Sequence, residues 1–138
     1  MFRGLVGICF YADDLSAARD WYTTLLGLEP YFVRPHPPAE RAYIEFRVGD
    51  DQDELGILDR RYGPPGAANP LGGAVTGWHV DDVRGAMETL LAMGATEYEP
   101  IDEQDGFVTA SVIDPFGNVL GISHNPHSLE MHAARNKV

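Results

Sequence analysis

The alternation of apolar and polar positions along the chain predicts the same series of elements twice. Residues 4–12 and 73–80 read as strands, and each run leads into an Asp-Asp pair, at 13–14 and at 81–82. After each pair, apolar residues recur every three or four positions, which is typical of a helix with one buried face. Each half closes with a strand-like run, Glu54–Leu58 or Val119–Ser123. The pattern therefore predicts a unit of about 65 residues, strand–helix–strand–strand–strand, that occurs twice.

Residues at the ends of the two predicted helices support this organisation. Asp14 and Asp82 are suited to N-caps, because an Asp side chain accepts hydrogen bonds from the free amides of the first turn. Gly27 and Gly94 are suited to the C-terminal ends, where a left-handed backbone favours glycine. Neither half is long enough to bury a full core alone, so we expect a single α+β domain over residues 1–138. Within it lie module 1 (about 4–62), a Gly- and Pro-rich connector (about 61–72), module 2 (about 73–124) and a tail (125–138).

Composition and charge narrow the range of partners. The formal net charge of -11 argues against nucleic acid, because binding to phosphates depends on Lys and Arg. The sequence contains no apolar run of the length that crosses a bilayer, and its first residues lack the pattern of a signal peptide. The single cysteine, Cys9, excludes an internal disulfide and is typical of a reducing compartment. We therefore expect a soluble cytoplasmic protein with no membrane or nucleic-acid partner.

Four short motifs give the chain a resemblance to a known family. They are residues 14–22 (DLSAARDWY), 26–28 (LGL), 80–83 (VDDV) and 114–118 (DPFGN). Together with the repeat, they resemble the vicinal oxygen chelate superfamily, which includes glyoxalase I, bleomycin-resistance proteins and extradiol dioxygenases. The resemblance covers about residues 4–124. It implies two tandem βαβββ modules whose curved mixed sheets form a cleft, a small-molecule ligand in that cleft, and a homodimer.

The same resemblance identifies where a metal would bind. Metal-dependent members carry ligands, usually His and Glu, on the first and last strand of each half. The matching positions here are Gly7, Gly56, Val75 and Gly121, none of which has a side chain that coordinates a metal. We therefore expect no metal and no cofactor. Glycine within a strand packs nothing, so we also expect that these positions leave room for a ligand.

Strand alternation then predicts which side chains line the cleft. The predicted ligand-binding set is Cys9, Tyr11, Tyr43, Glu45, Leu58, His79, Thr109, Ser111 and Ser123. Glu45 and His79 are the candidates for acid–base chemistry. His79 is also expected as a histidine whose hydrogen bonds are satisfied by a neighbouring carboxylate or backbone group, and Glu45 as a solvated strand carboxylate. Cys9 is better explained as a small apolar filler than as a nucleophile, because the sequence shows no base beside it. His124, His127 and His132 match no closed zinc pattern, and we expect them to lie in a mobile tail.

Three interpretations of the function follow. The first is a metal-independent binding protein of the bleomycin-resistance type, which sequesters an aromatic or planar compound and so confers antibiotic resistance. The second is an enzyme of the same superfamily (a lyase, isomerase or dioxygenase), either atypical in its metal ligands or metal-free and using His79 and Glu45. The third is a regulatory module that senses a metabolite. Fold alone does not choose among them, because one scaffold hosts many chemistries.

Overall fold

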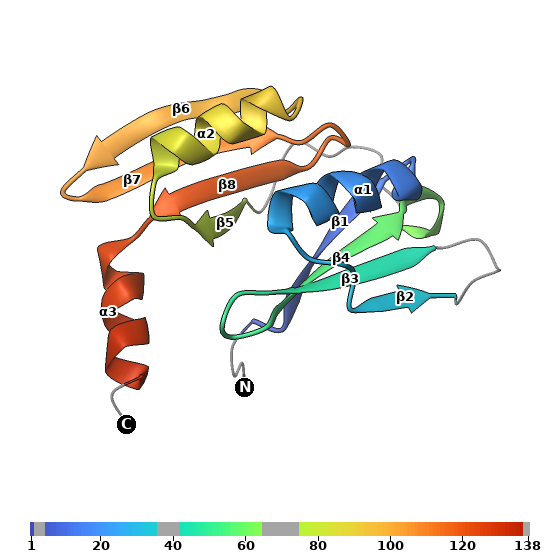
Figure 1. Ribbon diagram of the computed structural model, residues 1–138, viewed down its shortest axis with the longest axis horizontal. Coiled ribbons are helices and arrows are strands. Elements are labelled where there is room, and N and C mark those ends of the chain that lie inside the picture. The colour runs from blue at the N-terminus through green and yellow to red at the C-terminus, as the bar shows by residue number, and fades with distance from the viewer. Residues whose placement is uncertain (2–4, 36–41, 65–74, 137–138) are drawn as a thin grey trace. The chain divides into compact units, whose positions relative to one another are not determined.

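The computed structural model describes residues 1, 5–35, 42–64 and 75–136 (Figure 1). Within these residues the elements follow the order β1, α1, β2, β3, β4, η1, then β5, α2, β6, β7, β8 and α3. The prediction of an α+β fold with two βαβββ repeats is therefore confirmed. The chain forms two compact units. Unit 1 comprises Met1–Pro70 with Phe116–Asn118, and unit 2 comprises Leu71–Pro115 with Val119–Val138.

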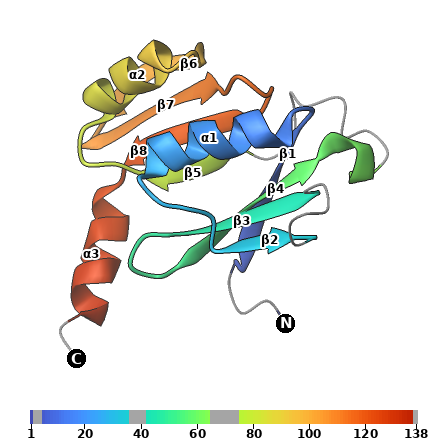
Figure 2. The ribbon, with the colours of Figure 1, turned by 45° about the vertical axis from the view of Figure 1, so that its right-hand side comes forward.

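Unit 1 is a four-stranded sheet with one helix packed on it (Figures 1 and 2). Its elements are β1 (Gly7–Ala12), α1 (Leu15–Leu26), β2 (Phe32–Arg34), β3 (Tyr43–Val48), β4 (Asp53–Asp59) and the short 3₁₀ helix η1 (Arg60–Tyr62). The strands follow the order β1-β4-β3-β2, with β1 parallel to β4 and the other neighbours antiparallel. The helix lies against β3 and β4, so one face of the sheet is covered by α1.

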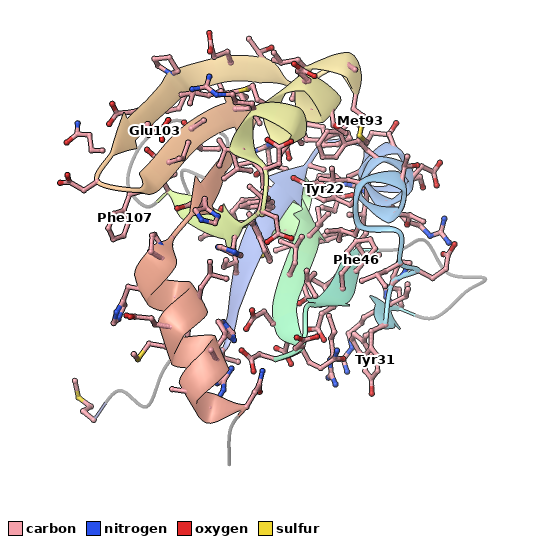
Figure 3. All side chains as sticks on the ribbon, turned by 60° about the vertical axis from the view of Figure 1, so that its left-hand side comes forward. Tyr22, Tyr31, Phe46, Met93, Glu103 and Phe107 are labelled. Carbon is pink, nitrogen blue, oxygen red and sulfur yellow. The ribbon has the colours of Figure 1, made fainter. Side chains whose placement is uncertain are left out.

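The core of unit 1 lies between α1 and its sheet. Ile44, Phe46, Leu55 and Ile57 are at most 1% exposed, and Tyr22 of α1 is equally buried. The rings of Tyr22 and Phe46 are tilted neighbours, with centroids 6.5 Å apart (Figure 3). Burying each of these side chains contributes roughly 1.5–3 kcal/mol, so this layer is the main source of stability in the unit.

The ends of α1 follow the predicted signals. The Asp14 side chain accepts a hydrogen bond from the Ala17 amide, and Gly27 ends the helix with a left-handed φ of 67°. The start of α2 is built in the same way, with the Asp82 side chain accepting from the Gly85 amide. Met93 caps the end of α2, and Gly94 follows it with a φ of 95°.

A short piece of the second repeat belongs to unit 1. The side chain of Asn118 accepts a hydrogen bond from the Tyr11 amide and donates one to the Tyr11 carbonyl, at 3.1 and 3.0 Å. These two bonds satisfy the backbone of the edge strand β1 at that point. Phe116 packs against Trp21 and Tyr22, with both ring pairs within 6.5 Å. The Asp-Pro-Phe-Gly-Asn turn therefore closes the edge of the first sheet.

Unit 2 repeats the architecture of unit 1 with a longer, irregular edge strand. Its elements are β5 (Thr76–His79), α2 (Val83–Ala92), β6 (Thr96–Gln104), β7 (Phe107–Ile113), β8 (Val119–His124) and α3 (Pro126–Arg135). The strands follow the order β5-β8-β7-β6, and α2 packs on β6, β7 and β8. Two register shifts interrupt the pairing of β6 with β7, between Glu97 and Glu99 and between Glu99 and Asp102.

The segment after β8 differs from the expected mobile tail. Residues Pro126–Arg135 form α3, which begins at an Asn125 cap that accepts from the Ser128 amide. None of its ten residues, all of which the structure describes, is buried. In Figure 1 the helix leads away from its sheet at the end of β8.

Of the predicted connector, residues 65–72 lie outside the described residues. In the described parts of the chain, no helix is both long and apolar enough to cross a membrane.

Candidate functional site

The sheet face of unit 1 that lies opposite α1 carries all five of the residues predicted there. The strand registers align Tyr11 with Leu58 and Leu58 with Tyr43, which makes one row across the sheet. The neighbouring row contains Cys9, Gly56 and Glu45. The side chains of Tyr11, Tyr43, Glu45 and Leu58 are half-buried, and Cys9 is exposed. The structure therefore gathers an aromatic and polar surface here, and its role in ligand binding stays a prediction.

Tyr43 and Glu45 form a hydrogen-bonded pair at the middle of this face. The Tyr43 hydroxyl donates to Glu45 Oε1 at 3.0 Å. Burial raises the pKa of Tyr43 above its ordinary value, and the hydrogen bond to Glu45 raises it further. The phenol is therefore neutral at physiological pH and acts as the donor of the pair.

Arg47 joins this pair and was not part of the predicted site. Its guanidinium lies 3.7 Å from Glu45 Oε2 and 3.6 Å from Glu54 Oε1, and it lies over the Tyr31 ring at 3.8 Å. Alternation alone places Arg47 on this face. No local pattern indicates that two carboxylates face the same guanidinium, because Glu54 is on a different strand.

Cys9 is not activated as a nucleophile. Partial burial raises the pKa of the Cys9 thiol, and the hydrogen bond from Tyr11 only partly opposes this effect. A reactive thiolate needs the opposite shift, usually from a nearby positive charge. The raised pKa gives no support to a nucleophilic Cys9, and its role as a filler stays a prediction for an exposed side chain.

The corresponding face of unit 2 carries the remaining four predicted residues. The register aligns His79 with Ser123 and Ser123 with Thr109, and it aligns Gly121 with Ser111 in the next row. Ser111 is completely buried, and its hydroxyl donates to Glu99 Oε2 at 2.7 Å. A ligand on this face would therefore meet the exposed Glu99 rather than Ser111. Glu99 escaped prediction because the two register shifts of β6 break the strict alternation on which the prediction depends.

His79 lies at the end of β5 with two polar neighbours. Its Nε2 atom is 3.8 Å from Asp81 Oδ1, and its ring centroid is 5.6 Å from that of His124. Asp81 is fully exposed, so this ion pair is weak. His79 belongs to unit 2 and Glu45 to unit 1, so neither unit by itself holds the predicted acid–base pair. Catalysis by that pair stays a prediction.

The expectation that glycine leaves room at the matched metal positions is wrong for three of them. A Cβ atom at Gly121 would lie 2.5 Å from the Thr76 carbonyl oxygen, and one at Gly7 would lie 2.9 Å from that of Glu54. At Gly56 a Cβ atom would collide with the Tyr43 ring. These glycines allow close approach of neighbouring groups, which already fill the space.

The residues at the matched positions do not fit a metal centre. Gly7, Gly56 and Gly121 have no side chain, and Val75 offers only a half-exposed apolar one. Within the described parts of the chain, no three His, Cys, Asp or Glu residues are arranged to hold a metal ion. The four matched positions therefore supply no side chain that could bind a metal.

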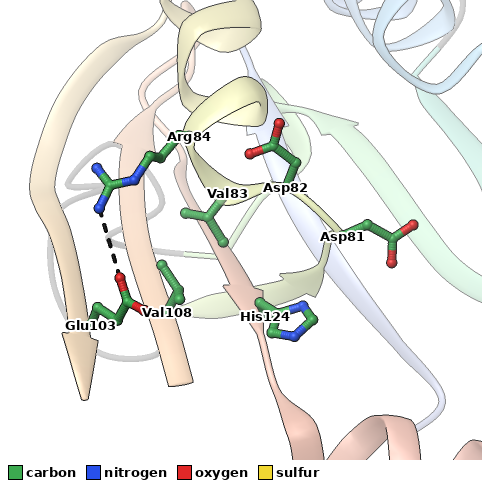
Figure 4. Close-up of a pocket in the computed structure, with 7 residues that line it drawn as sticks. All are labelled: Asp81, Asp82, Val83, Arg84, Glu103, Val108 and His124. Atoms are coloured by element: carbon green, nitrogen blue, oxygen red, sulfur yellow. Dashed lines mark ion pairs between the residues drawn. The ribbon is translucent and has the colours of Figure 1, made fainter. Parts of the chain in front are cut away.

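A pocket of about 260 Å³ lies on the other face of the unit 2 sheet, at the start of α2 (Figure 4). The residues that line it are Asp81, Asp82, Val83, Arg84, Glu103, Val108 and His124. Arg84 and Glu103 form an ion pair across one side at 3.8 Å. None of the predicted ligand-binding residues lines this pocket, so it does not coincide with the predicted site.

Comparison with known proteins places the chain in a family. The sequence pattern of the Glyoxalase/Bleomycin resistance protein/Dioxygenase superfamily matches residues 4–122. The chain therefore belongs to this superfamily, as the four motifs predicted. No curated protein matches the chain.

Solved structures share the fold at low sequence identity. A protein from Agrobacterium tumefaciens, solved by NMR in solution, has a TM-score of 0.71 and 20% identity over 89% of this chain and 98% of that chain. Lactoylglutathione lyase from the same organism has a TM-score of 0.65 and 24% identity, covering 91% and 96%. The fosfomycin resistance protein FosX from Mesorhizobium loti has a TM-score of 0.63 and 13% identity, covering 95% and 99%. At these identities the likeness shows the fold alone.

Proposed function

We propose that this chain is a small-molecule binding protein that holds a flat, aromatic compound against the open sheet face of unit 1. The observation that carries the proposal is the row of Tyr11, Leu58 and Tyr43, which lies directly beside the hydrogen-bonding group of Glu45. Apolar and aromatic surface with a few fixed polar groups is the usual composition of a ligand site. Tyrosine rings offer flat contact area, and the polar neighbours orient the bound molecule.

We propose further that binding needs no metal and that it serves sequestration in the cytoplasm, with resistance to a toxic compound such as an antibiotic as its outcome. The support for metal independence is the chemistry of Gly7, Gly56, Val75 and Gly121. One or two side chains rarely hold a transition metal. Elemental analysis of untagged, dialysed protein should therefore find far less than one zinc, iron, manganese or nickel per chain. A value near one would contradict this part of the proposal.

A ligand screen with site variants tests the proposal. Flat aromatic compounds are screened by thermal shift, and each hit is titrated against the wild type and the Tyr11→Ala variant. Removing the Tyr11 ring should weaken binding roughly tenfold, because it removes one of the two aromatic rings of the row. Tyr62→Ala is the matched control, since Tyr62 is an exposed tyrosine in η1, outside the sheet. Titration of His79→Ala with the same compounds tests whether the unit 2 face also takes part in binding. Failure of every compound to bind, or equal binding by wild type and Tyr11→Ala, would refute the proposal.

A further inference from the structure

We propose that the unit 1 face recognises hydrogen-bond donors on its ligand, so that the ligand is a flat ring compound with N–H or O–H groups. The inference rests on the proposed function, because it concerns the same face. On this face the hydroxyl and thiol donors are already paired, whereas the Glu45 carboxylate can accept further hydrogen bonds.

The hydroxyl and thiol donors of this face are already used. Tyr43 donates to Glu45 at 3.0 Å, and the Tyr11 hydroxyl is hydrogen-bonded to Cys9. The Cys9 thiol in turn contacts the Phe10 carbonyl at 3.5 Å. A ligand that presents only carbonyl or ether oxygens would have to break one of these bonds or bind to an arginine of the face.

Acceptor capacity, in contrast, is left over. An ionised carboxylate accepts about four hydrogen bonds. Among the described residues, Glu45 receives one hydroxyl on Oε1 and has the Arg47 Nε atom 3.7 Å from Oε2. That separation exceeds hydrogen-bond distance. The Glu45 side chain is 14% exposed, and its second oxygen is not among the buried atoms that lack a partner, so a ligand that covers this oxygen displaces water from it. A donor on the ligand would satisfy a half-buried acceptor, which is favourable because an unsatisfied polar group is costly.

The two arginines of the face affect this inference differently. Arg47 lies over Tyr31 and faces Glu45 and Glu54, and its Nε atom is buried without a hydrogen-bond partner among the described residues. A ligand therefore cannot reach the Nε–H group, whereas the Arg47 side chain as a whole is 33% exposed and its Nη2 atom lies 3.6 Å from Glu54 Oε1. Arg34 is exposed on the edge strand β2, where it is aligned with Tyr43 in the row next to that of Glu45. Its Cζ atom lies 5.3 Å from the centroid of the Phe32 ring. It would attract an anion, which makes an anionic probe a necessary part of the test.

Three naphthalene probes of matched size separate these possibilities. Naphthalenediol presents two O–H donors, its dimethyl ether keeps the ring and the oxygens but has no donor, and naphthoate is an anion. Affinities are measured by titration calorimetry for the wild type, Glu45→Gln and Glu88→Gln. Glu88 is an exposed carboxylate on α2, so its variant controls for the loss of one negative charge away from the face.

We expect the diol to bind at least about tenfold more tightly than its ether, since hydrogen bonds to charged groups are the stronger ones. The preference should fall to a few-fold in Glu45→Gln and stay intact in Glu88→Gln. Equal binding of diol and ether, tighter binding of naphthoate, or a preference that survives in Glu45→Gln would overturn the inference while leaving the proposed function in place. If no naphthalene probe and no compound of the wider screen binds, both are refuted.

Discussion

At single residues, glycine at two of the matched metal positions, Gly7 and Gly121, is required because a neighbouring backbone carbonyl lies where a Cβ atom would be. Gly121 shows this most clearly, because the Thr76 carbonyl of the parallel neighbour β5 occupies the place of its missing side chain. A strand can tolerate glycine at a cost of roughly 0.5–1 kcal/mol, and here the close approach of two strands offsets that cost. Replacing this residue by the glutamate of metal-dependent relatives would therefore disturb the sheet before it created a ligand.

Alanine substitution at two paired glycines tests this explanation. Gly121→Ala should lower the free energy of unfolding by about 1–3 kcal/mol, because the methyl group has no space. Gly77 is the matched control, since it lies opposite Gly121 in the register and a Cβ atom there meets no described atom within 4 Å. Gly77→Ala should leave stability unchanged or raise it slightly. Denaturant melts of both variants provide the comparison, and equal stability of the two would show that the close contact with Thr76 does not matter.

Tyr43 makes stability depend on pH in the alkaline range. Its pKa is raised in the folded protein by burial and by Glu45, whereas in the unfolded chain it ionises near pH 10. Above that pH the unfolded state binds fewer protons than the folded state, so the free energy of unfolding falls as pH rises. Tyr43→Phe should make this decline shallower, and Tyr62→Phe, at an exposed tyrosine, should keep the decline of the wild type. Urea melts at a series of pH values from neutral to alkaline would measure this dependence. If the free energy of unfolding falls equally steeply with pH in all three proteins, the role of Tyr43 is contradicted.

At the element scale, the sequence predicted the repeats and most strand faces but not the irregular pieces. Caps such as Asp14 and Gly27 act locally, so their effect could be read from neighbouring residues. The faces of β1, β3 and β4 followed from strict alternation, whereas β6 carries two register shifts that no local pattern signals. The position of Arg47 between Glu45 and Glu54 depends on which strands become neighbours, and that is a property of the folded sheet. The helix α3 had its local signals, Asn125 and Pro126, but it lies outside the repeat that guided the interpretation.

The helix α3 is expected to contribute little to the stability of the protein. A chain that ends at Asn125 should keep its stability within about 0.5 kcal/mol, because none of the described residues of α3 is buried. Far-ultraviolet circular dichroism should lose the signal of this helix. Leu90→Ala on α2 is the comparison, since Leu90 is 2% exposed and its truncation should cost about 2–5 kcal/mol. If removing α3 destabilises the protein as much as Leu90→Ala does, α3 packs against a partner surface.

At the scale of the whole molecule, the two sheets differ in how their edges are protected. β6 carries Pro100, several carboxylates and two register shifts, all of which oppose pairing with another strand. β2 has only three residues. Among the described residues, the edge strand β5 carries no proline, carboxylate or register shift: Gly77 is exposed within it, and Val75, just before it, is 52% exposed. The residues of β5 therefore oppose pairing with another chain less than those of β6, and β5 offers a longer strand than β2.

We accordingly predict a homodimer in solution that involves the β5 edge. A twofold interface places the same surface of each chain against the other, so one exposed edge is enough to build it. Light scattering over a wide concentration range should give the mass of two chains, and a monomer at high micromolar concentration would contradict the prediction.

Val75→Lys should shift the equilibrium towards monomer, because a charge beside a strand edge opposes pairing with another strand. Tyr98→Lys, at an equally accessible position on β6, should leave the dimer intact. If both variants stay dimeric, the dimer uses a surface other than β5; if Tyr98→Lys alone dissociates it, the dimer forms through β6.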